Sequence, residues 1–446
     1  METMERKKFY IETYGCQMNV ADSEVVASLM NENGYDRTEK MEEADLILVN
    51  TCSIRENAEQ RVWGRLDVFK QVKTRKPGLK VGVIGCMAER LKEKLIDQEK
   101  SVDLVIGPDA YRAIPQLIET VETGQKGINT LLSKEETYGD IAPVRTDKNQ
   151  ISAFISIMRG CNNMCSYCIV PYVRGRERSR DPQTILRETR DLIEQGFHEI
   201  TLLGQNVDSY AWKNPDGSLM SFAELLDQTA QVNPNLRIRF STSHPKDLSD
   251  EVLQVMAQHP NICRHIHLPV QSGSTRILKK MNRGYTREWY MNRIDAIRRY
   301  LPECEITTDI MTGFCDETEE DHKDTLSLME YANYDFAYMF KYSERPGTKA
   351  ARRMEDNVPE ETKKRRLSEI IDLQNQISTE NKKKMVGKKF TVLVEGTSKK
   401  SQDEFSGRNS QNQVVVFPKN GEKTGDFVEV KIVDTTPATL IGEKIY

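Results

Sequence analysis

The chain has 446 residues and a mass of 51.3 kDa, which exceeds a typical single domain and predicts roughly two to four domains. Hydrophobic residues make up 38% of the chain and charged residues 30%, and no run of about 18 apolar residues occurs, which excludes collagen-like and membrane-spanning classes. The net charge of −4 excludes a uniformly basic protein. Because no secretory signal pattern is present, we expect a cytoplasmic protein, away from membranes, whose nine cysteines serve metal or redox chemistry rather than disulfides.

The first part of the chain alternates short apolar runs with charged amphipathic stretches. This rhythm is typical of βαβ units and predicts an N-terminal α/β domain with a parallel sheet over residues 1–125. Residues 126–150 are rich in charge and lack a sustained period, so we interpret them as a linker. The four strand-like runs are 8–16, 44–52, 80–86 and 102–108.

A second series of strand-like runs begins near residue 153, and a helical pattern follows most of them. Six such units predict an open, partial (βα)6 barrel, since a closed barrel would need about eight. We place this core domain at 151–380, ending in a charged bridging helix that begins near Glu360. Residues 381–446 alternate apolar and polar positions and predict a small antiparallel β-barrel. Their 12 Lys or Arg against 8 Asp or Glu weakly favour an anionic partner.

The segment RGCNNMCSYC contains Cys161, Cys165 and Cys168 in a C-x3-C-x2-C spacing. Three thiolates on one loop suit three irons of an iron-sulfur cluster, and the remaining iron then has an open position for a substrate or cofactor. A zinc site is the alternative, but structural zinc usually takes four protein ligands in paired spacings.

A second trio, Cys16, Cys52 and Cys86, is spread over 71 residues, but each cysteine ends a strand-like run. The carboxyl ends of parallel strands lie on one edge of a sheet, so the three thiols are expected to converge as ligands of a second cluster. The alternative is three unrelated buried cysteines, because free cysteine is often buried. We expect core packing for the remaining cysteines, Cys263, Cys304 and Cys315.

Polar residues at the ends of the second and third barrel strands are candidates for cofactor contacts, although they could also be ordinary caps. An arginine run after the cysteine loop either contacts phosphate or carboxylate groups or forms a solvated face. The strand-end residues are Gln205, Asn206, Ser243 and His244, and the arginines are Arg174, Arg176, Arg178 and Arg180.

The loop with Cys161, Cys165, Tyr167 and Cys168 resembles the C-x3-C-x-aromatic-C loop of the radical S-adenosylmethionine enzymes. This resemblance implies that S-adenosylmethionine binds the open iron and is cleaved to a 5′-deoxyadenosyl radical, with Tyr167 among the cofactor-binding residues. Together with ETYGCQMN, NTCSIRE, GCMAER, HLPVQSGS and YSERPGT, the whole chain resembles the methylthiotransferases.

Within that family, Gln17-Met18-Asn19 is similar to the branch that makes 2-methylthio-N6-isopentenyladenosine in tRNA. The resemblance implies two [4Fe–4S] clusters, two uses of S-adenosylmethionine, a tRNA anticodon loop as partner, a cellular reductant and a sulfur donor. We also expect a monomer. Methylthio transfer would occur at C2 of the adenosine immediately 3′ of the anticodon. The alternatives are threonylcarbamoyladenosine in tRNA, a ribosomal protein aspartate, and a noncatalytic iron-sulfur protein that binds RNA or transfers electrons.

The C-terminal barrel resembles the TRAM domain, an RNA-binding module. This resemblance implies phosphate contacts from a lysine group and nucleotide contacts from two further residues. A lysine run at a helix end could instead complement the helix dipole. The lysines are Lys382, Lys383, Lys384, Lys388 and Lys389, and the two further residues are Arg408 and Phe417.

Overall fold

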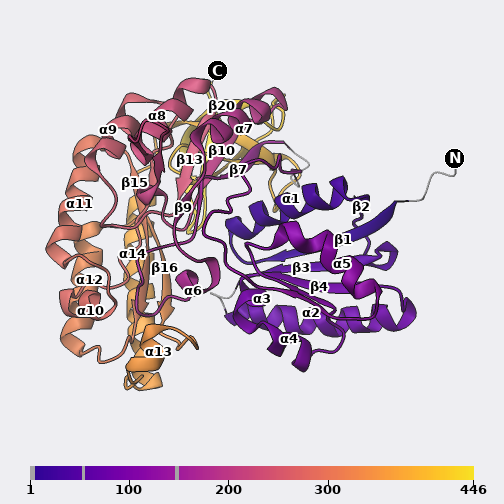
Figure 1. Ribbon diagram of the computed structural model, residues 1–446. Coiled ribbons are helices and arrows are strands. Elements are labelled where there is room, and N and C mark those ends of the chain that lie inside the picture. Colours follow the sequence, from indigo (N-terminus) through magenta and orange to yellow (C-terminus); the bar gives the residue numbers. More distant parts are fainter. Residues whose placement is uncertain (1–5, 53–55, 146–149, 446) are drawn as a thin grey trace. The chain divides into compact units, whose positions relative to one another are not determined.

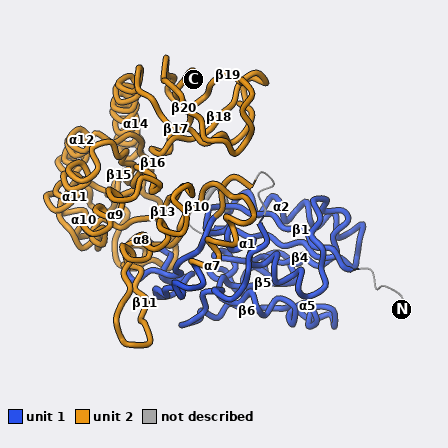
Figure 2. Tube along the Cα trace, turned by 90° about the horizontal axis from the view of Figure 1, so that it is seen from above, with its two compact units in different colours: residues 1–146, 154–162, 168–185 blue, residues 147–153, 163–167, 186–446 orange. Residues whose placement is uncertain are grey.

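The computed structural model describes residues 6–52, 56–145 and 150–445, which form two compact units (Figure 2). Unit 1 contains residues 1–146, 154–162 and 168–185, and unit 2 contains 147–153, 163–167 and 186–446. Part of the expected linker, 146–149, and residues 53–55 of the NTCSIRE motif lie outside the described residues. The segment that follows the linker therefore contributes to both units.

Unit 1 is built on a parallel sheet of six strands in the order β2-β1-β3-β4-β5-β6. Four strands match the four apolar runs of the sequence, because a central parallel strand is buried on both faces and reads as a continuous apolar run. The strands are β1 Lys7–Tyr14, β2 Tyr35–Arg37, β3 Leu46–Thr51, β4 Lys80–Gly85, β5 Leu104–Ile106 and β6 Gly127–Asn129.

The expected linker differs from the structure. Its first residues form β6, which pairs in parallel with β5, and Tyr138 and Ile141 are buried in the core of unit 1. The ring of Tyr138 stacks on Tyr111 at a centroid distance of 5.5 Å. Periodicity could not reveal a three-residue edge strand, and single anchoring side chains leave no pattern. Residues 126–145 therefore belong to the N-terminal fold.

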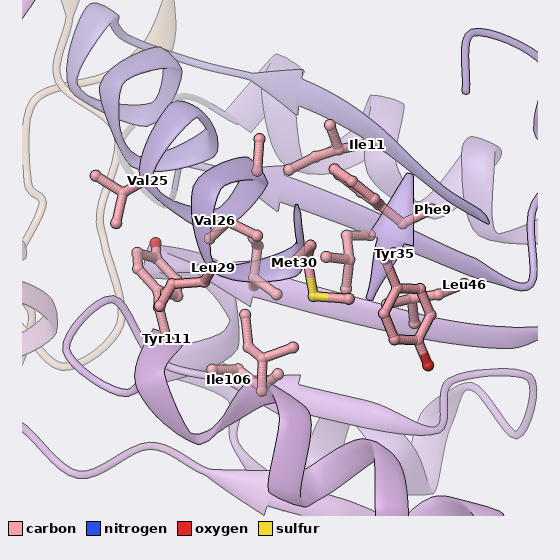
Figure 3. Packing of buried hydrophobic residues seen from close by; sticks show 14 of the residues in the cluster. Phe9, Ile11, Val25, Val26, Leu29, Met30, Tyr35, Leu46, Ile106 and Tyr111 are labelled. Carbon is pink, nitrogen blue, oxygen red and sulfur yellow. The ribbon is translucent and has the colours of Figure 1, made fainter. Parts of the chain in front are cut away.

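Helices cover both faces of this sheet (Figure 1). Leu46 and Leu48 of β3 face one helical layer, whereas Ile47 and Val49 face the other, as the two-residue period of a strand requires. Figure 3 shows the first layer, in which Val26 and the other side chains of α1 pack against the sheet. The first layer contains α1 Gln17–Glu32, η2 Tyr111–Ala113 and α5 Ile114–Glu122, and the second contains α2 Glu56–Arg75, α3 Cys86–Leu91 and α4 Glu93–Gln98.

Three short elements surround the cysteine loop. The hairpin strands β8 (Met158–Arg159) and β9 (Arg178–Ser179) pair antiparallel, and helix α6 (Val170–Arg174) lies between them in the chain. Cys161, Cys165 and Cys168 occupy the connection from β8 to α6. Both α6 and the hairpin belong to unit 1.

The six strands expected for the barrel are all present. They form two three-stranded sheets, β13-β10-β7 and β14-β15-β16. A parallel bridge between Ile238 of β13 and Ile262, which precedes β14, links the two sheets. This confirms the partial (βα)6 barrel. The strands are β7 Ser152–Ser156, β10 Glu199–Leu203, β13 Arg237–Ser241, β14 His265–His267, β15 Glu305–Thr312 and β16 Phe336–Lys341.

Helices follow these strands and form the outer layer of the partial barrel (Figure 1). Capping fixes where several of them begin, as at α12, where the side chain of Thr318 accepts from Asp321 N and the side chain of Asp321 accepts from Thr318 N. The helices are α7 Pro182–Glu194, α8 Phe222–Val232, α9 Asp250–Gln258, α10 Thr275–Lys280, α11 Arg287–Tyr300, α12 Glu319–Ala332, α13 Lys349–Arg353 and the bridging helix α14 Glu360–Lys383. The loops also contain η1 Met41–Glu43, η3 Val207–Ser209 and the hairpin β11 Ala211–Lys213 with β12 Leu219–Ser221.

A closed five-stranded barrel ends the chain, in the order β17-β18-β19-β21-β20. Its pairings are antiparallel except for β19 with β21, which run parallel. Arg237 and Arg239 of β13 hold it to the core by donating to backbone carbonyls of Arg408 and Asn409 at 2.7 and 2.8 Å. The strands are β17 Lys389–Thr397, β18 Glu404–Arg408, β19 Val414–Pro418, β20 Phe427–Thr435 and β21 Leu440–Lys444.

Across residues 6–52, 56–145 and 150–445, no helix combines the length and apolar character needed to cross a bilayer.

Candidate functional site

Three cysteines follow the carboxyl ends of three neighbouring strands in unit 1. The last paired residues of β1, β3 and β4 lie side by side, since Tyr14 pairs with Thr51 and Thr51 pairs with Gly85. Cys52 and Cys86 come directly after their strands, and Cys16 is two residues beyond Tyr14. The strand-end geometry expected from the sequence is therefore present in the fold.

Two glycines allow these strand ends to approach one another. Gly15 has φ +126°, and a Cβ on it would lie 2.5 Å from Cys52 Cβ. Gly85 has φ +88°, and a Cβ there would lie 2.4 Å from Asn50 Oδ1. Any larger side chain would meet both backbone strain and a steric clash, so both turns require glycine.

The thiols of this trio influence one another. A hydrogen bond with Cys52 lowers the pKa of Cys16 to about 6, supported by the nearby charge of Arg174 and opposed by burial. Burial raises the pKa of Cys86, and Arg174 opposes that effect. Asn19 Nδ2 donates to Tyr14 O at 3.0 Å, which holds the start of α1 against the strand end. Cys16 is therefore the thiol best prepared to act as a thiolate.

A buried arginine from α6 reaches this group. Arg174 Nε donates to Cys86 Sγ at 3.2 Å, and its Nη2 donates to Asn19 Oδ1 at 3.2 Å and to Asp22 Oδ2 at 2.8 Å. Arg174 is 3% exposed, and its Nη1 has no hydrogen-bond partner among the described residues. Beside it, Ile169 and Val173 pack against Cys86. The cysteine therefore has a charged neighbour and an apolar cover from one short segment.

The arginine belongs to a larger buried ion network within unit 1. Arg159 Nη1 donates to Asp22 Oδ1 at 2.7 Å, and Arg159 also lies 3.6 Å from Asp109. Arg178 donates to Asp109 at 2.9 Å. Three guanidinium groups thus share two carboxylates, and the group joined by these contacts carries one excess positive charge. A buried excess of positive charge favours an anion beside it, and Arg174 is the member that contacts a cysteine.

This network changes the interpretation of the arginine run. Arg174, Arg178 and Arg180 are buried, and only Arg176 is exposed, so the solvated-face alternative is wrong for three of the four. Arg180 donates to Thr184 Oγ1 at 2.9 Å and to backbone carbonyls. The carboxylates that Arg174 and Arg178 contact are those of Asp22 and Asp109 in their own chain.

Cys165, the member of the second cysteine group that belongs to unit 2, also has a buried arginine partner. Arg283 Nη1 donates to Cys165 Sγ and to Tyr167 Oη, both at 3.4 Å, and its Nη2 donates to Pro269 O at 2.6 Å. The ring of Tyr167 meets Phe314 edge to face at a centroid distance of 6.4 Å. Arg283 lies 118 residues from Cys165 in the chain, within the segment KKMNRGYT, which is similar to the tRNA branch of the family but did not point to a contact with the cysteine loop.

Each of the two cysteine trios offers three thiols, the ligand type that [4Fe–4S] clusters take. A [4Fe–4S] cluster gives each cysteine its own iron, so its ligands stand farther apart than the ligands of one ion. Cys86 and Cys165 each accept a hydrogen bond from a buried arginine, which suits an anionic thiolate cluster. The chemistry of the residues therefore fits the predicted groups.

The strand-end polar residues gather in unit 2 beyond β10 and β13. Asn206 is buried and its Nδ2 donates to Asp247 Oδ2 at 2.7 Å, while Gln205 beside it is half-buried. Ser243 and His244 are buried, and burial lowers the pKa of His244 to about 2, so its ring is neutral. Asn206 Oδ1 and His244 Nε2 have no hydrogen-bond partner within the described part of the chain. Buried acceptors and donors without partners are typical of a binding site.

One titratable group of this cluster escaped the sequence analysis. Burial raises the pKa of Asp208 to about 7, against the opposing effects of Ser243 and the His244 backbone. Asp208 lies two residues beyond Asn206, on η3. The only available signal was an acidic residue shortly after a buried strand, which is common at helix starts.

Two C-terminal expectations have different outcomes. Phe417 is fully buried in the core of the barrel, so its expected nucleotide contact is wrong. It alternates with the half-buried Val416 and the exposed Pro418 on β19, and its side chain points inward. Arg408 is half-buried and its Nε lies 3.3 Å from Glu395 Oε1. The exposed members of the lysine group are Lys383, Lys384, Lys388 and Lys389.

Comparison with known families covers most of the chain. A model of the uncharacterized protein family UPF0004 matches residues 8–107, the Radical SAM superfamily matches 155–329, and the TRAM domain matches 383–445.

Individual relatives match nearly the full length. A protein of Bacteroides fragilis named tRNA-2-methylthio-N(6)-dimethylallyladenosine synthase is 58% identical over 442 residues, which cover 99% of this chain and 96% of the relative. A protein of the same name from Amoebophilus asiaticus is 58% identical and covers 98% of this chain and 92% of its own length. Among solved structures, the radical S-adenosylmethionine methyltransferase TsrM from Kitasatospora setae matches with a TM-score of 0.60 and 14% identity, over 78% of this chain and 75% of that one. This likeness concerns the fold.

Proposed function

The chain belongs to the radical S-adenosylmethionine family of tRNA-2-methylthio-N6-dimethylallyladenosine synthases, and we propose that it methylthiolates C2 of N6-isopentenyladenosine immediately 3′ of the anticodon. The observation that carries this proposal is the trio Cys16, Cys52 and Cys86 at neighbouring strand ends, in a chain 58% identical to such synthases over its full length.

We assign the two cysteine groups to two [4Fe–4S] clusters. Cys161, Cys165 and Cys168 would hold the cluster that binds S-adenosylmethionine, and Cys16, Cys52 and Cys86 would hold an auxiliary cluster. When bound, these groups supply the one-electron and sulfur chemistry of the reaction. Tyr167, with its hydroxyl held by Arg283, supports the first loop.

The strand-end polar group is assigned to cofactor binding. Asn206 and His244 offer buried hydrogen-bonding atoms, and Gln205 and Ser243 lie beside them in the chain. Because Lys246 N donates to His244 Nδ1, the neutral ring carries its hydrogen on Nε2, which can donate one hydrogen bond without adding charge. We infer that this group orients S-adenosylmethionine at the carboxyl ends of β10 and β13.

The tRNA is expected to meet the exposed lysines at the start of the C-terminal barrel. Replacing Lys383, Lys384, Lys388 and Lys389 together with glutamine should lower tRNA affinity about tenfold or more near 0.15 M salt, because each lost phosphate contact removes counterion release. The slope of log affinity against log salt, measured by filter binding or anisotropy, should become shallower by up to about three.

A control with the same charge change uses four exposed lysines of unit 1, Lys40, Lys70, Lys94 and Lys100. An equal loss of affinity in this control would mean that net charge, rather than the barrel, governs tRNA binding.

An aromatic row on edge strand β16 is a second expected RNA contact. Phe336, Tyr338 and Phe340 occupy alternating positions, so they share one face, and each remains 45–49% exposed. Stacking of an unpaired base on an aromatic ring contributes about 1–3 kcal/mol. Tyr338→Ala should therefore raise KM for isopentenylated tRNA about 5- to 100-fold while the iron content stays unchanged.

Tyr331, an exposed tyrosine on α12, provides the matched control for this variant. Tyr331→Ala should leave KM unchanged. Equal effects of the two variants on KM in steady-state kinetics would contradict a role for the β16 row.

The proposed activity is tested by incubating the anaerobically reconstituted protein with S-adenosylmethionine, a reductant and isopentenylated tRNA, followed by nucleoside mass spectrometry. The expected product is 2-methylthio-N6-isopentenyladenosine. Threonylcarbamoylated tRNA and a ribosomal protein are run alongside, and product from either of them alone would overturn the branch assignment. A protein that binds tRNA but forms no 5′-deoxyadenosine would be noncatalytic.

We further propose that the protein acts as a monomer in the cytoplasm, where its tRNA substrate resides, and that it depends on a cellular one-electron reductant and a sulfur donor. Size-exclusion chromatography with light scattering, with and without tRNA, tests the monomer.

A further inference from the structure

We propose that Arg174 is a positioning residue that sets the reduction potential of the auxiliary cluster through its hydrogen bond to the sulfur of Cys86. This inference rests on the proposed function, because it requires a cluster on Cys16, Cys52 and Cys86. It assigns to a residue of α6 a role that the cysteine motifs do not describe.

The geometry ties one charged group to one sulfur. Arg174 Nε lies 3.2 Å from Cys86 Sγ, and the side chain is 3% exposed. Asn19 and Asp22 accept from Nη2 at 3.2 and 2.8 Å, so three hydrogen bonds hold the guanidinium group beside the sulfur. Its Nη1 has no hydrogen-bond partner among residues 6–52, 56–145 and 150–445 and remains available to a group bound beside Cys86.

The charge of the network makes this contact electrostatically effective. Asp22 is shared between Arg174 and Arg159, so a single carboxylate does not neutralise the two arginines. A [4Fe–4S] cluster becomes more negative by one charge when it accepts an electron, without any bond being broken. A buried cation that donates to a cluster sulfur therefore stabilises the reduced form and raises the reduction potential.

The segment that carries Arg174 also shields Cys86 from water. Helix α6 begins two residues after Cys168, and Ile169 and Val173 pack on Cys86. The segment that carries the arginine therefore also excludes water from the cysteine it contacts. Exclusion of water strengthens the electrostatic effect of a nearby charge.

The test uses the full chain with Cys161, Cys165 and Cys168 replaced by alanine, so that only the auxiliary cluster contributes to the signal. Its midpoint potential is measured without tRNA by anaerobic redox titration followed by electron paramagnetic resonance. Arg174→Gln should shift the potential to a more negative value, with a reduced-to-oxidised ratio about tenfold lower at the parent midpoint, which corresponds to about 59 mV for one electron. Arg174→Lys should give a smaller shift.

Arg178→Gln is the matched control. Arg178 is buried in the same network and donates to Asp109 and to backbone carbonyls, and none of these hydrogen bonds within the described residues reaches a cysteine. Its removal takes away one positive charge without removing the bond to Cys86, so its shift should be clearly smaller than that of Arg174→Gln. Equal shifts in the two variants, or no shift in Arg174→Gln, would overturn the inference.

Iron and sulfide content separates the remaining outcomes. If Arg174→Gln loses its iron, Arg174→Lys decides: a retained cluster with a negative shift supports the inference, and a lost cluster overturns it in favour of a role in assembly. If the parent with only Cys16, Cys52 and Cys86 holds no cluster, the proposed function itself fails. Failure of the inference and failure of the proposed function are thus distinct results.

Discussion

Replacing Cys16, Cys52 and Cys86 together with alanine is expected to lower the anaerobic iron content from about eight to about four atoms per chain. The three thiols follow neighbouring strand ends that two glycines bring into close approach, so they can serve one shared cluster. The remaining irons should belong to the loop with Cys161, Cys165 and Cys168. Iron and acid-labile sulfide assays measure both quantities directly.

The activity of this variant separates the two chemical steps. With S-adenosylmethionine and a reductant, it should still form 5′-deoxyadenosine, but its yield of 2-methylthio-N6-isopentenyladenosine should fall below detection. The reciprocal variant, in which Cys161, Cys165 and Cys168 are alanine, should retain about four irons and lose both products. Cys304→Ala is the single-site control. Cys304 precedes strand β15 and belongs to neither cysteine trio, so this variant should keep about eight irons.

Two outcomes would contradict this assignment. About four irons in the unsubstituted protein would remove the auxiliary cluster and the reason for methylthio transfer. A colourless protein with bound zinc and no sulfide would favour the zinc alternative for the cysteine loop.

The general fold could be predicted because apolar patterning is a local property. The runs that became β3, β4 and β5 are buried on both faces, and β1 buries Phe9 and Ile11 between half-buried residues. Cys16, Cys52 and Cys86 follow the ends of β1, β3 and β4, as expected. Short or shared elements could not be predicted in the same way. β6 has three residues, which is too short for a pattern, so the sequence predicted a linker where the structure has an edge strand. Segments of the chain between residues 147 and 185 are assigned alternately to the two units, and no sequence pattern marks these changes.

The candidate site could be predicted only where its residues form motifs. The cysteines carry a spacing or a strand-end position, whereas the partners of the cysteines come from distant parts of the chain. Arg159 and Arg174 reach Asp22 across 137 and 152 residues, and no local pattern distinguishes such arginines from a solvated charge run. The predicted nucleotide contact of Phe417 was wrong for a different reason: an aromatic residue on an alternating strand can point to either face, and the side chain of Phe417 points into the barrel.

The same distant ion network predicts the largest effect on stability. Asp22→Asn should destabilise unit 1 by roughly 3–5 kcal/mol, because it leaves Arg159 and Arg174 buried without their shared carboxylate. In a background with Trp212 and Trp289 changed to phenylalanine, Trp63 of α2 reports the unfolding of unit 1 in urea. Asp36→Asn is the control, because Asp36 is paired with Arg6 on the surface and should change stability by less than about 1 kcal/mol.

The pH dependence of the stability lost in Asp22→Asn shows whether the loss comes from the ionised carboxylate. Burial alone would raise the pKa of Asp22, but the charges of Arg159 and Arg174 outweigh it and hold that pKa below its ordinary value. A carboxyl group with a depressed pKa in the folded state contributes its full stability above its unfolded pKa of about 3.9 and loses it as the pH falls through the folded value. The gap between the unsubstituted protein and Asp22→Asn should therefore be constant near neutral pH and shrink below about pH 4. A gap that stays constant down to acid unfolding would mean that packing, rather than the ionised carboxylate, accounts for the loss.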